Sequence, residues 1–299
     1  MVMSINQGSF KGLYGVLDHT FRKYASKVVT ETWQGRKAND KPDMATHELL
    51  NVCMSVSLYD YYGQTRTATD PFNLDHWRDD CKPHLPWADN HFAERVSGAP
   101  LNPGATYQDW RHGVSAHSFT ENGIFNHTYM ERMWPKYAGK LGVLHDLDEF
   151  NTEVGLGEGD LNPHRGIRGE YGDLLDLVNM LVREPHTRQA YLPLYFPEDT
   201  GADGRKPCTL GYQFILRNQR LHCYYPMRSC DYANHFRDDC YLAVRLLLWV
   251  INQCRIADPL GPWNDVMPGS LTIHCTSFHL FANDFIALCQ EESNLWTTS

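Results

Sequence analysis

The sequence lacks a run of apolar residues long enough to span a bilayer. Its longest run, 241–251, contains Arg245 and is shorter than the about 20 residues that a membrane-spanning helix needs. The first residues, MVMSINQGSF, do not combine a cationic start with an apolar stretch, so no secretory signal is expected there. We therefore predict a cytoplasmic protein without a membrane partner.

Cysteines in metal-ligand spacing are also absent. The 9 cysteines form no CxxC pair and no Cys/His pattern typical of a zinc site. Their number is odd, and a cytoplasmic setting keeps thiols reduced. We therefore expect no metal centre, and one of the thiols is a candidate nucleophile.

Positive charge is scarce relative to negative charge. Lys and Arg total 27 and Asp and Glu total 36, so the formal net charge is −9. Nucleic-acid surfaces depend on clustered cations, so no nucleic-acid partner is expected, although a local cationic pocket for one phosphate is compatible with this charge. The length of 299 residues and the apolar fraction of 42% are sufficient for a globular core.

The chain contains no internal repeat and no low-complexity tract. Turn-forming residues predict loops over 63–76 and 97–113. The glycine-rich stretch 139–172 is interpreted as an insertion, because periodic structure resumes directly after it. We expect one domain over 1–299.

The clearest secondary-structure signals lie in the C-terminal half. A helix is predicted between a capping Asp173 and Pro185. Strands are predicted over 190–196, 210–216, 221–225 and 271–281, with a hairpin between the middle two, and a helix buried on all sides over 238–254. This order of elements predicts a mixed α/β or α+β fold.

Several chemistry-bearing residues follow one another in this half in a specific order. They are Pro207-Cys208, Gln213-Phe214, Arg228-Ser229-Cys230-Asp231 and His279. Each has an ordinary structural interpretation, since a cysteine beside a strand is usually a core residue and a histidine on an apolar strand is usually satisfied within the core. Their order and spacing, however, resemble the thymidylate synthase superfamily over about 187–288.

This resemblance implies the thymidylate synthase fold, a mixed β-sheet with flanking helices, and an obligate homodimer with shared active sites. Arg228 and Ser229 match the residues that hold the nucleotide phosphate, and Arg188 matches an arginine supplied by the opposite subunit. His279 matches a sugar-binding histidine. The further substrate-binding candidates are Gln213, Cys230 and Asp231, of which Asp231 is also a cofactor-binding candidate.

Cys208 is the candidate nucleophile. Carbon 5 of a pyrimidine is a poor nucleophile, and addition of a thiolate to carbon 6 converts the ring into an enolate or enamine that attacks a one-carbon donor. A guanidinium lowers the pKa of a nearby thiol and can also hold a phosphate, which suits Arg228. The resemblance implies 5,10-methylenetetrahydrofolate as the donor and a pyrimidine nucleoside monophosphate as the substrate.

Asp239 occupies the position that reads the base. Counted without gaps, it stands where thymidylate synthases carry an asparagine that pairs with uracil. A carboxylate accepts from the exocyclic amine of cytosine but is poorly paired against O4 of uracil, at a cost of about 1–3 kcal/mol. Phage deoxycytidylate hydroxymethylases carry an aspartate at this place, and Thr209 replaces the histidine that follows the nucleophile in most thymidylate synthases. A cytidine nucleotide is therefore expected.

The upstream match consists of short strings. Glu48 in THELL (46–50) is similar to the family glutamate, which is carried on a helix and moves protons at the base, with Glu94 in reserve. Tyr129 in TYMERM (128–133) matches the family tyrosine, which is carried on a loop near the base, with Tyr107 as runner-up. The ordinary alternatives are a solvated helix carboxylate and a core aromatic residue.

Two tryptophans are candidates for contact with the folate. Trp87 stands near the place of the family tryptophan, although a core tryptophan explains it equally well. The C-terminal ESNLWTTS does not match the usual family tail, but Trp296 is available to pack on the folate.

The chain also departs from the family at the phosphate and at the sugar. Gln189 stands in place of a second consecutive arginine, and the usual N-terminal phosphate loop is not recognisable, which leaves Arg22 and Arg36 as candidates. Phe281 replaces a sugar-binding tyrosine and so removes a hydroxyl. Relatives from nucleoside-antibiotic pathways use the ribonucleotide, and this altered sugar site favours CMP slightly over dCMP.

The sequence therefore predicts a hydroxymethylase that attaches a one-carbon unit to carbon 5 of CMP or dCMP, with water attacking the exocyclic methylene. Cytidylate methylation with hydride from tetrahydrofolate, and a dUMP-directed hydroxymethylase, are alternatives on the same scaffold. An alternative of another class is a nucleotide- or RNA-binding protein that has lost turnover. The expected location is the cytoplasm, or the host cytoplasm if a phage encodes the chain.

Overall fold

The structure is a computed structural model in which two compact units are distinguished. The first unit contains 1–83, 217–248 and 266–299, and the second contains 84–216 and 249–265. The described residues are 3–29, 32–33, 36–37, 45–59, 70–112, 120–138, 172–201 and 205–297. The expected insertion over 139–172 lies outside the described residues except for Gly172.

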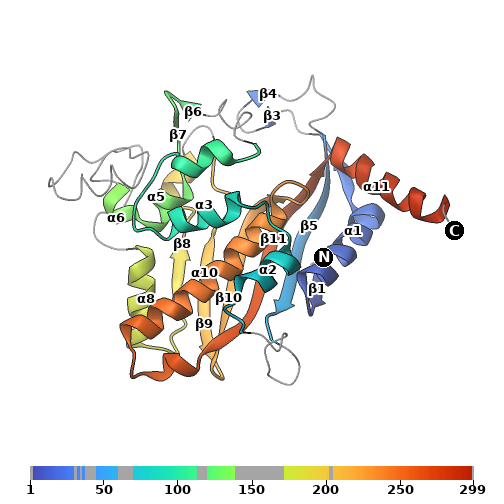
Figure 1. Ribbon diagram of the computed structural model, residues 1–299. Coiled ribbons are helices and arrows are strands. Elements are labelled where there is room, and N and C mark those ends of the chain that lie inside the picture. Colours follow the sequence, from blue (N-terminus) through green and yellow to red (C-terminus); the bar gives the residue numbers. More distant parts are fainter. Residues whose placement is uncertain are drawn as a thin grey trace. The chain divides into compact units, whose positions relative to one another are not determined.

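A mixed β-sheet forms the centre of the first unit (Figure 1). Its strands are β1 (Met3–Gln7), β2 (Ser26–Val28), β5 (Thr46–Ser57), β10 (Arg220–Asp231) and β11 (Met267–Phe281). The order is β1-β5-β11-β10, with β2 beside β5. β1 is parallel to β5 and β10 is parallel to β11, whereas β5 and β11 are antiparallel. The expected mixture of helices and sheet is thus confirmed.

Helices flank this sheet. They are α1 (Phe10–Tyr24), α2 (Leu74–Cys81), the first part of α10 (Phe236–Ala257) and α11 (Ala282–Thr297). α1 begins after Ser9, whose hydroxyl accepts a hydrogen bond from the Gly12 amide at 3.0 Å, and it packs against β1 and β5 (Figure 1). A short β3 (Thr32–Trp33) pairs with β4 (Arg36–Lys37).

Aromatic rings in tilted and edge-to-face contact join α1, β11 and the start of α10. Phe278 on β11 lies 5.2 Å from Phe21, 5.5 Å from Tyr232 and 4.8 Å from Phe236, measured between ring centroids. The Tyr232 hydroxyl donates to the carboxylate of Asp18 at 2.5 Å. Because these rings are buried, they hold one side of β11 firmly against the helices.

In β5, β10 and β11, every second side chain is buried, but this alternation shifts by one residue at one point in each strand. The three shifts lie side by side in one row of the sheet. Consecutive buried positions are three residues apart there: Met227 and Cys230 on β10, Cys275 and Phe278 on β11, and Val52 and Leu49 on β5. Asn51 in this row has a positive φ of 53°. Beyond it, Ser277 and His279 are half-buried, although they would continue the buried series of β11 in a regular strand.

The second unit is built of short helices and strands around the segment that carries Cys208. The elements are α3 (Trp87–Arg95), a 3-10 turn (Ala105–Asp109), β6 (Thr120–Glu121), β7 (Ile124–Phe125), α5 (Tyr129–Met133), α6 (Pro135–Ala138), α8 (Leu174–Arg183), β8 (Tyr191–Pro193), α9 (Pro197–Gly201), β9 (Gly211–Arg217) and a 3-10 turn (Pro262–Asp265). β8 pairs antiparallel with β9.

Most predicted elements of the C-terminal half are confirmed. α8 begins after Asp173 with a capping box and ends before Pro185, and β11 and α10 cover the expected ranges. Asn218 and Gln219, both with positive φ, form the link between β9 and β10, as in a two-residue hairpin turn. The strand expected over 190–196 is shorter and ends at Pro193, which cannot donate to a ladder.

Three expectations for the N-terminal half are wrong. The string 46–50 is not a helix but the start of β5, because this segment pairs with β11 on one edge and, over Thr46–Glu48, with β2 on the other. The loop expected over 63–76 gives way to a helix at Leu74, capped by Asn73. Tyr129 lies not on a loop but on the first residue of α5.

α10 is longer than the apolar run that the sequence suggested. Within the described part of the chain it is the one helix long and apolar enough to cross a membrane, over Phe236–Ala257. Of its most apolar window, 61% is buried inside the protein, which is a common property of core helices.

Candidate functional site

Cys208 lies half-buried on the segment that precedes β9. The amide of the next residue, Thr209, donates a hydrogen bond to the hydroxyl oxygen of Tyr129 at 3.3 Å. Tyr129 precedes Thr209 by 80 residues in the chain. The structure thus brings the side chain of the candidate tyrosine to the backbone amide that follows the candidate nucleophile, within the second unit.

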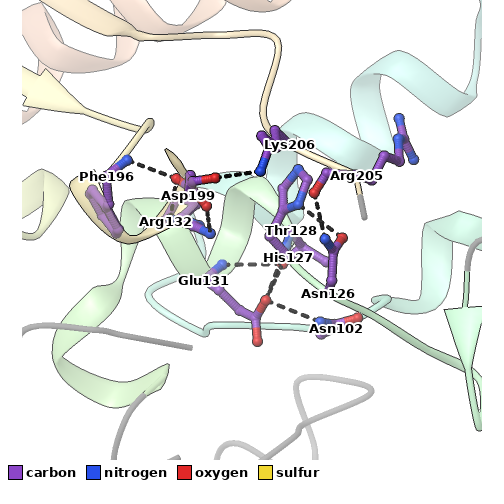
Figure 2. Close-up of polar contacts among 10 residues, drawn as sticks. All are labelled: Asn102, Asn126, His127, Thr128, Glu131, Arg132, Phe196, Asp199, Arg205 and Lys206. Atoms are coloured by element: carbon purple, nitrogen blue, oxygen red, sulfur yellow. Dashed lines mark hydrogen bonds and ion pairs between the residues drawn. The ribbon is translucent and has the colours of Figure 1, made fainter. Parts of the chain in front are cut away.

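The start of α5 is fixed in a way that orients Tyr129. Thr128 and Glu131 form a capping box, in which the Thr128 amide donates to Glu131 Oε2 at 3.0 Å. Asn102 Nδ2 donates to the same oxygen at 3.0 Å (Figure 2). The Thr128 hydroxyl donates to the Leu101 carbonyl at 2.6 Å. Because Thr128, Glu131 and Asn102 are buried, this network constrains the backbone at Tyr129.

A buried ion pair anchors the segment that leads to Cys208. Arg132 donates to the two carboxylate oxygens of Asp199 at 2.9 and 2.8 Å, and the two side chains are only 7% and 9% exposed. Lys206 Nζ donates to the Asp199 carbonyl at 2.7 Å, and Asn126 Nδ2 donates to the Arg205 carbonyl (Figure 2). These contacts hold Arg205 and Lys206, which directly precede Pro207 and Cys208.

Arg95, which the sequence did not single out, lies over the ring of Tyr129. Its guanidinium carbon is 4.7 Å from the ring centroid, which is a cation–π arrangement. Arg95 Nε donates to His91 Nε2 at 3.0 Å, so that nitrogen is unprotonated and the neutral ring carries its proton on Nδ1. His91 and Arg95 are four residues apart on α3 and therefore lie on one face of that helix.

Glu94 completes this series on α3. It is 6% exposed, accepts from the amide and hydroxyl of Thr106, and has Oε2 at 3.6 Å from His91 Nδ1. Burial raises the pKa of the Glu94 carboxyl, but the hydrogen bonds from His91 and Thr106 outweigh burial, so its pKa lies below the usual value. Gly104 has φ of 85°, and a Cβ there would meet Glu94 Oε2 at 2.8 Å, so only glycine fits.

Aromatic rings gather beside Glu94. The half-buried Trp87 stacks on His91 with centroids 4.8 Å apart and on Trp110 at 6.0 Å. Tyr107, the runner-up tyrosine, meets the edge of Phe125 at 4.9 Å. Burial raises the pKa of the Tyr107 phenol, against the opposing effect of the Arg205 charge.

Arg188 and Gln213 also lie together in the second unit. Gln213 Nε2 donates to the Arg188 carbonyl at 3.1 Å, which fixes the backbone of Arg188. The Arg188 side chain is exposed.

In the first unit, the candidates at the end of β10 form two pairs. Arg228 Nη1 donates to the Ser229 hydroxyl at 3.2 Å. The half-buried Asp239 has Oδ1 at 3.4 Å from the Tyr225 hydroxyl and Oδ2 at 3.5 Å from the Cys230 sulfur. Neutral donors therefore orient the Asp239 carboxylate.

Asp231 serves the turn between β10 and α10. Its carboxylate accepts from the amides of Ala233 and Asn234 at 3.1 Å each, and from Asn234 Nδ2 at 2.9 Å. This buried carboxylate is thus engaged within its own turn, as in an Asx turn.

His279 and Glu48 lie side by side across the sheet. The register pairs His279 with Glu48 on one side and with Asp231 on the other. Side chains that are directly opposite in neighbouring strands point to the same face. The Ser277 hydroxyl donates to Glu48 Oε1 on that face, and the Phe281 ring meets His279 edge-on at 5.7 Å.

Three further candidates are placed incompletely or elsewhere. Arg22 Nε donates to the Leu288 carbonyl at 3.1 Å, so this atom is engaged within the fold. The side chains of Arg36 and Trp296 lie outside the described residues.

Sequence reasoning missed His91, Arg95 and Thr106. The spacing of His91, Glu94 and Arg95 would have been a usable signal, because residues three and four apart share one face of a helix. Comparisons with protein-family models and with curated proteins found no match for this chain.

The buried pair generates a stability prediction. Asp199→Ala leaves the Arg132 guanidinium buried without a carboxylate, and loss of one partner of a buried ion pair costs about 3–5 kcal/mol. We expect urea denaturation to show a fall of this size in the free energy of unfolding. Asp79→Ala removes an exposed carboxylate that pairs with Lys11 and Lys82, and as a control it should leave the midpoint unchanged. An Asp199→Ala midpoint equal to that of Asp79→Ala would contradict the anchoring role.

Proposed function

We propose that this chain has the thymidylate synthase fold and hydroxymethylates carbon 5 of a cytidine monophosphate, with 5,10-methylenetetrahydrofolate as the one-carbon donor. The observation that carries the proposal is the hydrogen bond from Thr209 to Tyr129 beside Cys208. It supports a built nucleophile segment, because a core cysteine needs no anchored loop and no tyrosine at the next backbone amide.

Cys208 performs the covalent step. Its thiolate adds to carbon 6 of the pyrimidine, and carbon 5 then forms the bond to the donated carbon and loses its proton. The bond between the donated carbon and the tetrahydrofolate nitrogen breaks, which leaves an exocyclic methylene on carbon 5. Water adds to this methylene, and elimination of the thiolate from carbon 6 restores the ring. The balance is CMP plus the methylene donor plus water, giving 5-hydroxymethyl-CMP plus tetrahydrofolate.

Glu94 moves protons at the base in this proposal, in place of Glu48. Glu48 was selected for a helix that the structure does not contain, whereas Glu94 lies on α3 in the unit that carries Cys208 and Tyr129. Its carboxylate is ionised near neutral pH, because hydrogen bonds from His91 and Thr106 lower its pKa.

Asp239 selects cytosine over uracil. Its carboxylate accepts from the Tyr225 hydroxyl and the Cys230 thiol, and a carboxylate oxygen has more than one lone pair, so it can also accept from the exocyclic amine of cytosine. Against O4 of uracil the same oxygen faces a second acceptor, which is unfavourable.

The phosphate is bound by Arg228 and Ser229, which already contact each other. The exposed Arg188 is proposed to act on the phosphate of the partner subunit, in a homodimer with shared active sites in the cytoplasm. Gln213 positions Arg188 by donating a hydrogen bond to the Arg188 carbonyl. His279 binds the sugar.

The donor supplies one carbon at the oxidation level of formaldehyde when it is bound. The half-buried rings of Trp87 and Trp110 fit its flat heteroaromatic part, because aromatic faces stack on one another. Asp231 fits this role less well, since its carboxylate is engaged by Ala233 and Asn234. Trp296 is kept as a second stacking candidate.

Product analysis tests the reaction. We expect the protein, given methylenetetrahydrofolate and in separate reactions CMP, dCMP and dUMP, to yield a hydroxymethylated cytidine nucleotide by mass spectrometry. Cys208→Ser should lower turnover on the order of a thousandfold or more while nucleotide binding stays detectable. The exposed Cys289 offers the control, because Cys289→Ser should keep full turnover.

The outcomes of this test are distinct. A methylated nucleotide would assign the last step to hydride rather than to water. Unchanged turnover in Cys208→Ser would contradict the nucleophile, and no product from any nucleotide would favour a binding protein without turnover.

Base selection generates its own prediction. Asp239→Asn should raise the ratio of uridylate to cytidylate turnover by about tenfold or more, because the amide can donate to O4 of uracil. Asp75→Asn, a change of an exposed carboxylate, is the control and should leave the ratio unaltered. A ratio that stays the same in Asp239→Asn would count against Asp239 as the base-reading residue.

A further inference from the structure

Glu48 and His279 form a pair of polar side chains on the half-buried face of the first unit. Their Cα atoms are register partners across β5 and β11, and cross-strand partners bring their Cβ atoms to about 5 Å from each other. The shift in alternation at the row of Asn51 places them on this face, because without it position 279 would continue the buried series of β11.

Both side chains have hydrogen-bonding capacity that no described residue uses. Within the part of the chain that the structure describes, the one hydrogen bond to the Glu48 carboxylate comes from Ser277 and reaches Oε1. His279 has a ring contact with Phe281, and no described group bonds to either of its ring nitrogens. Glu48 Oε2 and the imidazole are therefore available to a ligand.

Two polar residues of β11 lie on this face, and one of them, Ser277, is already bonded to Glu48, which leaves His279 as the group of β11 for a sugar. Two residues beyond His279, on the same side of the strand, stands Phe281, which has no hydroxyl. A second sugar hydroxyl must therefore be bound from a neighbouring strand. Asp231, on the β10 side of His279, is engaged in its own turn, whereas Glu48 on the β5 side is not.

We infer that Glu48 binds the 2′-hydroxyl of the nucleotide sugar and so selects the ribonucleotide CMP over dCMP, an inference that rests on the proposed function. A carboxylate accepts hydrogen bonds from sugar hydroxyls, as the acidic residue of dinucleotide-binding folds does with a ribose 2′-hydroxyl. The two cis hydroxyls of a ribose lie on adjacent carbons, so His279 and Glu48, on adjacent strands, take one each. Ser277 holds the other oxygen of Glu48 and thereby orients it.

A ligand series on the unmodified protein tests this directly. Isothermal titration calorimetry would measure the dissociation constants of CMP, dCMP and 2′-O-methyl-CMP. CMP makes the hydrogen bond from its 2′-hydroxyl to the charged Glu48, and dCMP lacks this hydroxyl. CMP should therefore bind about ten- to a hundredfold more tightly than dCMP. The 2′-O-methyl nucleotide, which cannot donate, should bind no more tightly than dCMP. Equal affinity for CMP and dCMP would overturn the inference without any variant.

Glu48→Gln tests the residue. Glutamine keeps the size of the side chain and the acceptor for Ser277 but lowers the charge at the other position, so CMP should bind about tenfold more weakly while dCMP stays within about twofold. Glu121→Gln, an exposed carboxylate on β6, should leave both affinities unchanged. Equal weakening of CMP and dCMP in Glu48→Gln would overturn the assignment of the 2′-hydroxyl.

The failure of the inference and that of the proposed function look different. A protein that hydroxymethylates CMP and dCMP with equal kcat/KM keeps the proposed function and overturns the role of Glu48. A protein that binds none of the nucleotides loses the proposed function, and this inference with it.

Discussion

The shift in the alternation of buried side chains, at the same level of β5, β10 and β11, is the constraint that decides which residues of the first unit face its core. At the row of Asn51, the buried side chains of β5, β10 and β11 are three residues apart instead of two. On the buried side, Phe278 enters the aromatic cluster that ties β11 to α1 and α10. The next residue, His279, is thereby held on the half-buried face beside Glu48. The packing of Phe278 in the core thus determines that His279 and Glu48 lie on the half-buried face.

In the second unit, contacts on both sides restrain the segment that carries Cys208, the proposed nucleophile. The segment before Cys208 is held through Lys206 and the carbonyl of Asp199, whose carboxylate forms the buried pair with Arg132. The residue after Cys208 is held by Tyr129, and Tyr129 is covered by Arg95. Restraint on both sides limits the positions that the thiol can adopt, and orientation of a nucleophile is itself a contribution to catalysis.

The sequence predicted elements that local signals such as caps and periodicity define. It did not predict elements and contacts that depend on strand pairing or on packing between helices. The capping Asp173 and the periodicity of α8 defined that helix. The short string TYMERM selected Tyr129, whose hydroxyl accepts from the amide that follows Cys208. Glu48 was misplaced because a string of five residues carries no information about the strands that pair on both sides of it. Arg95 was missed because its contact with Tyr129 joins α3 to α5, which only tertiary packing determines.

Covalent trapping tests the central claim, that Cys208 adds to carbon 6 of a cytidine ring. With fluorine at carbon 5 of CMP, the base cannot lose a proton there, so the reaction should stop while the thiolate is still bound to the ring. After incubation with 5-fluoro-CMP and methylenetetrahydrofolate, peptide mass mapping should find the nucleotide on the peptide that contains Cys208. An adduct on another cysteine, or none from a protein that turns over CMP, would contradict the account.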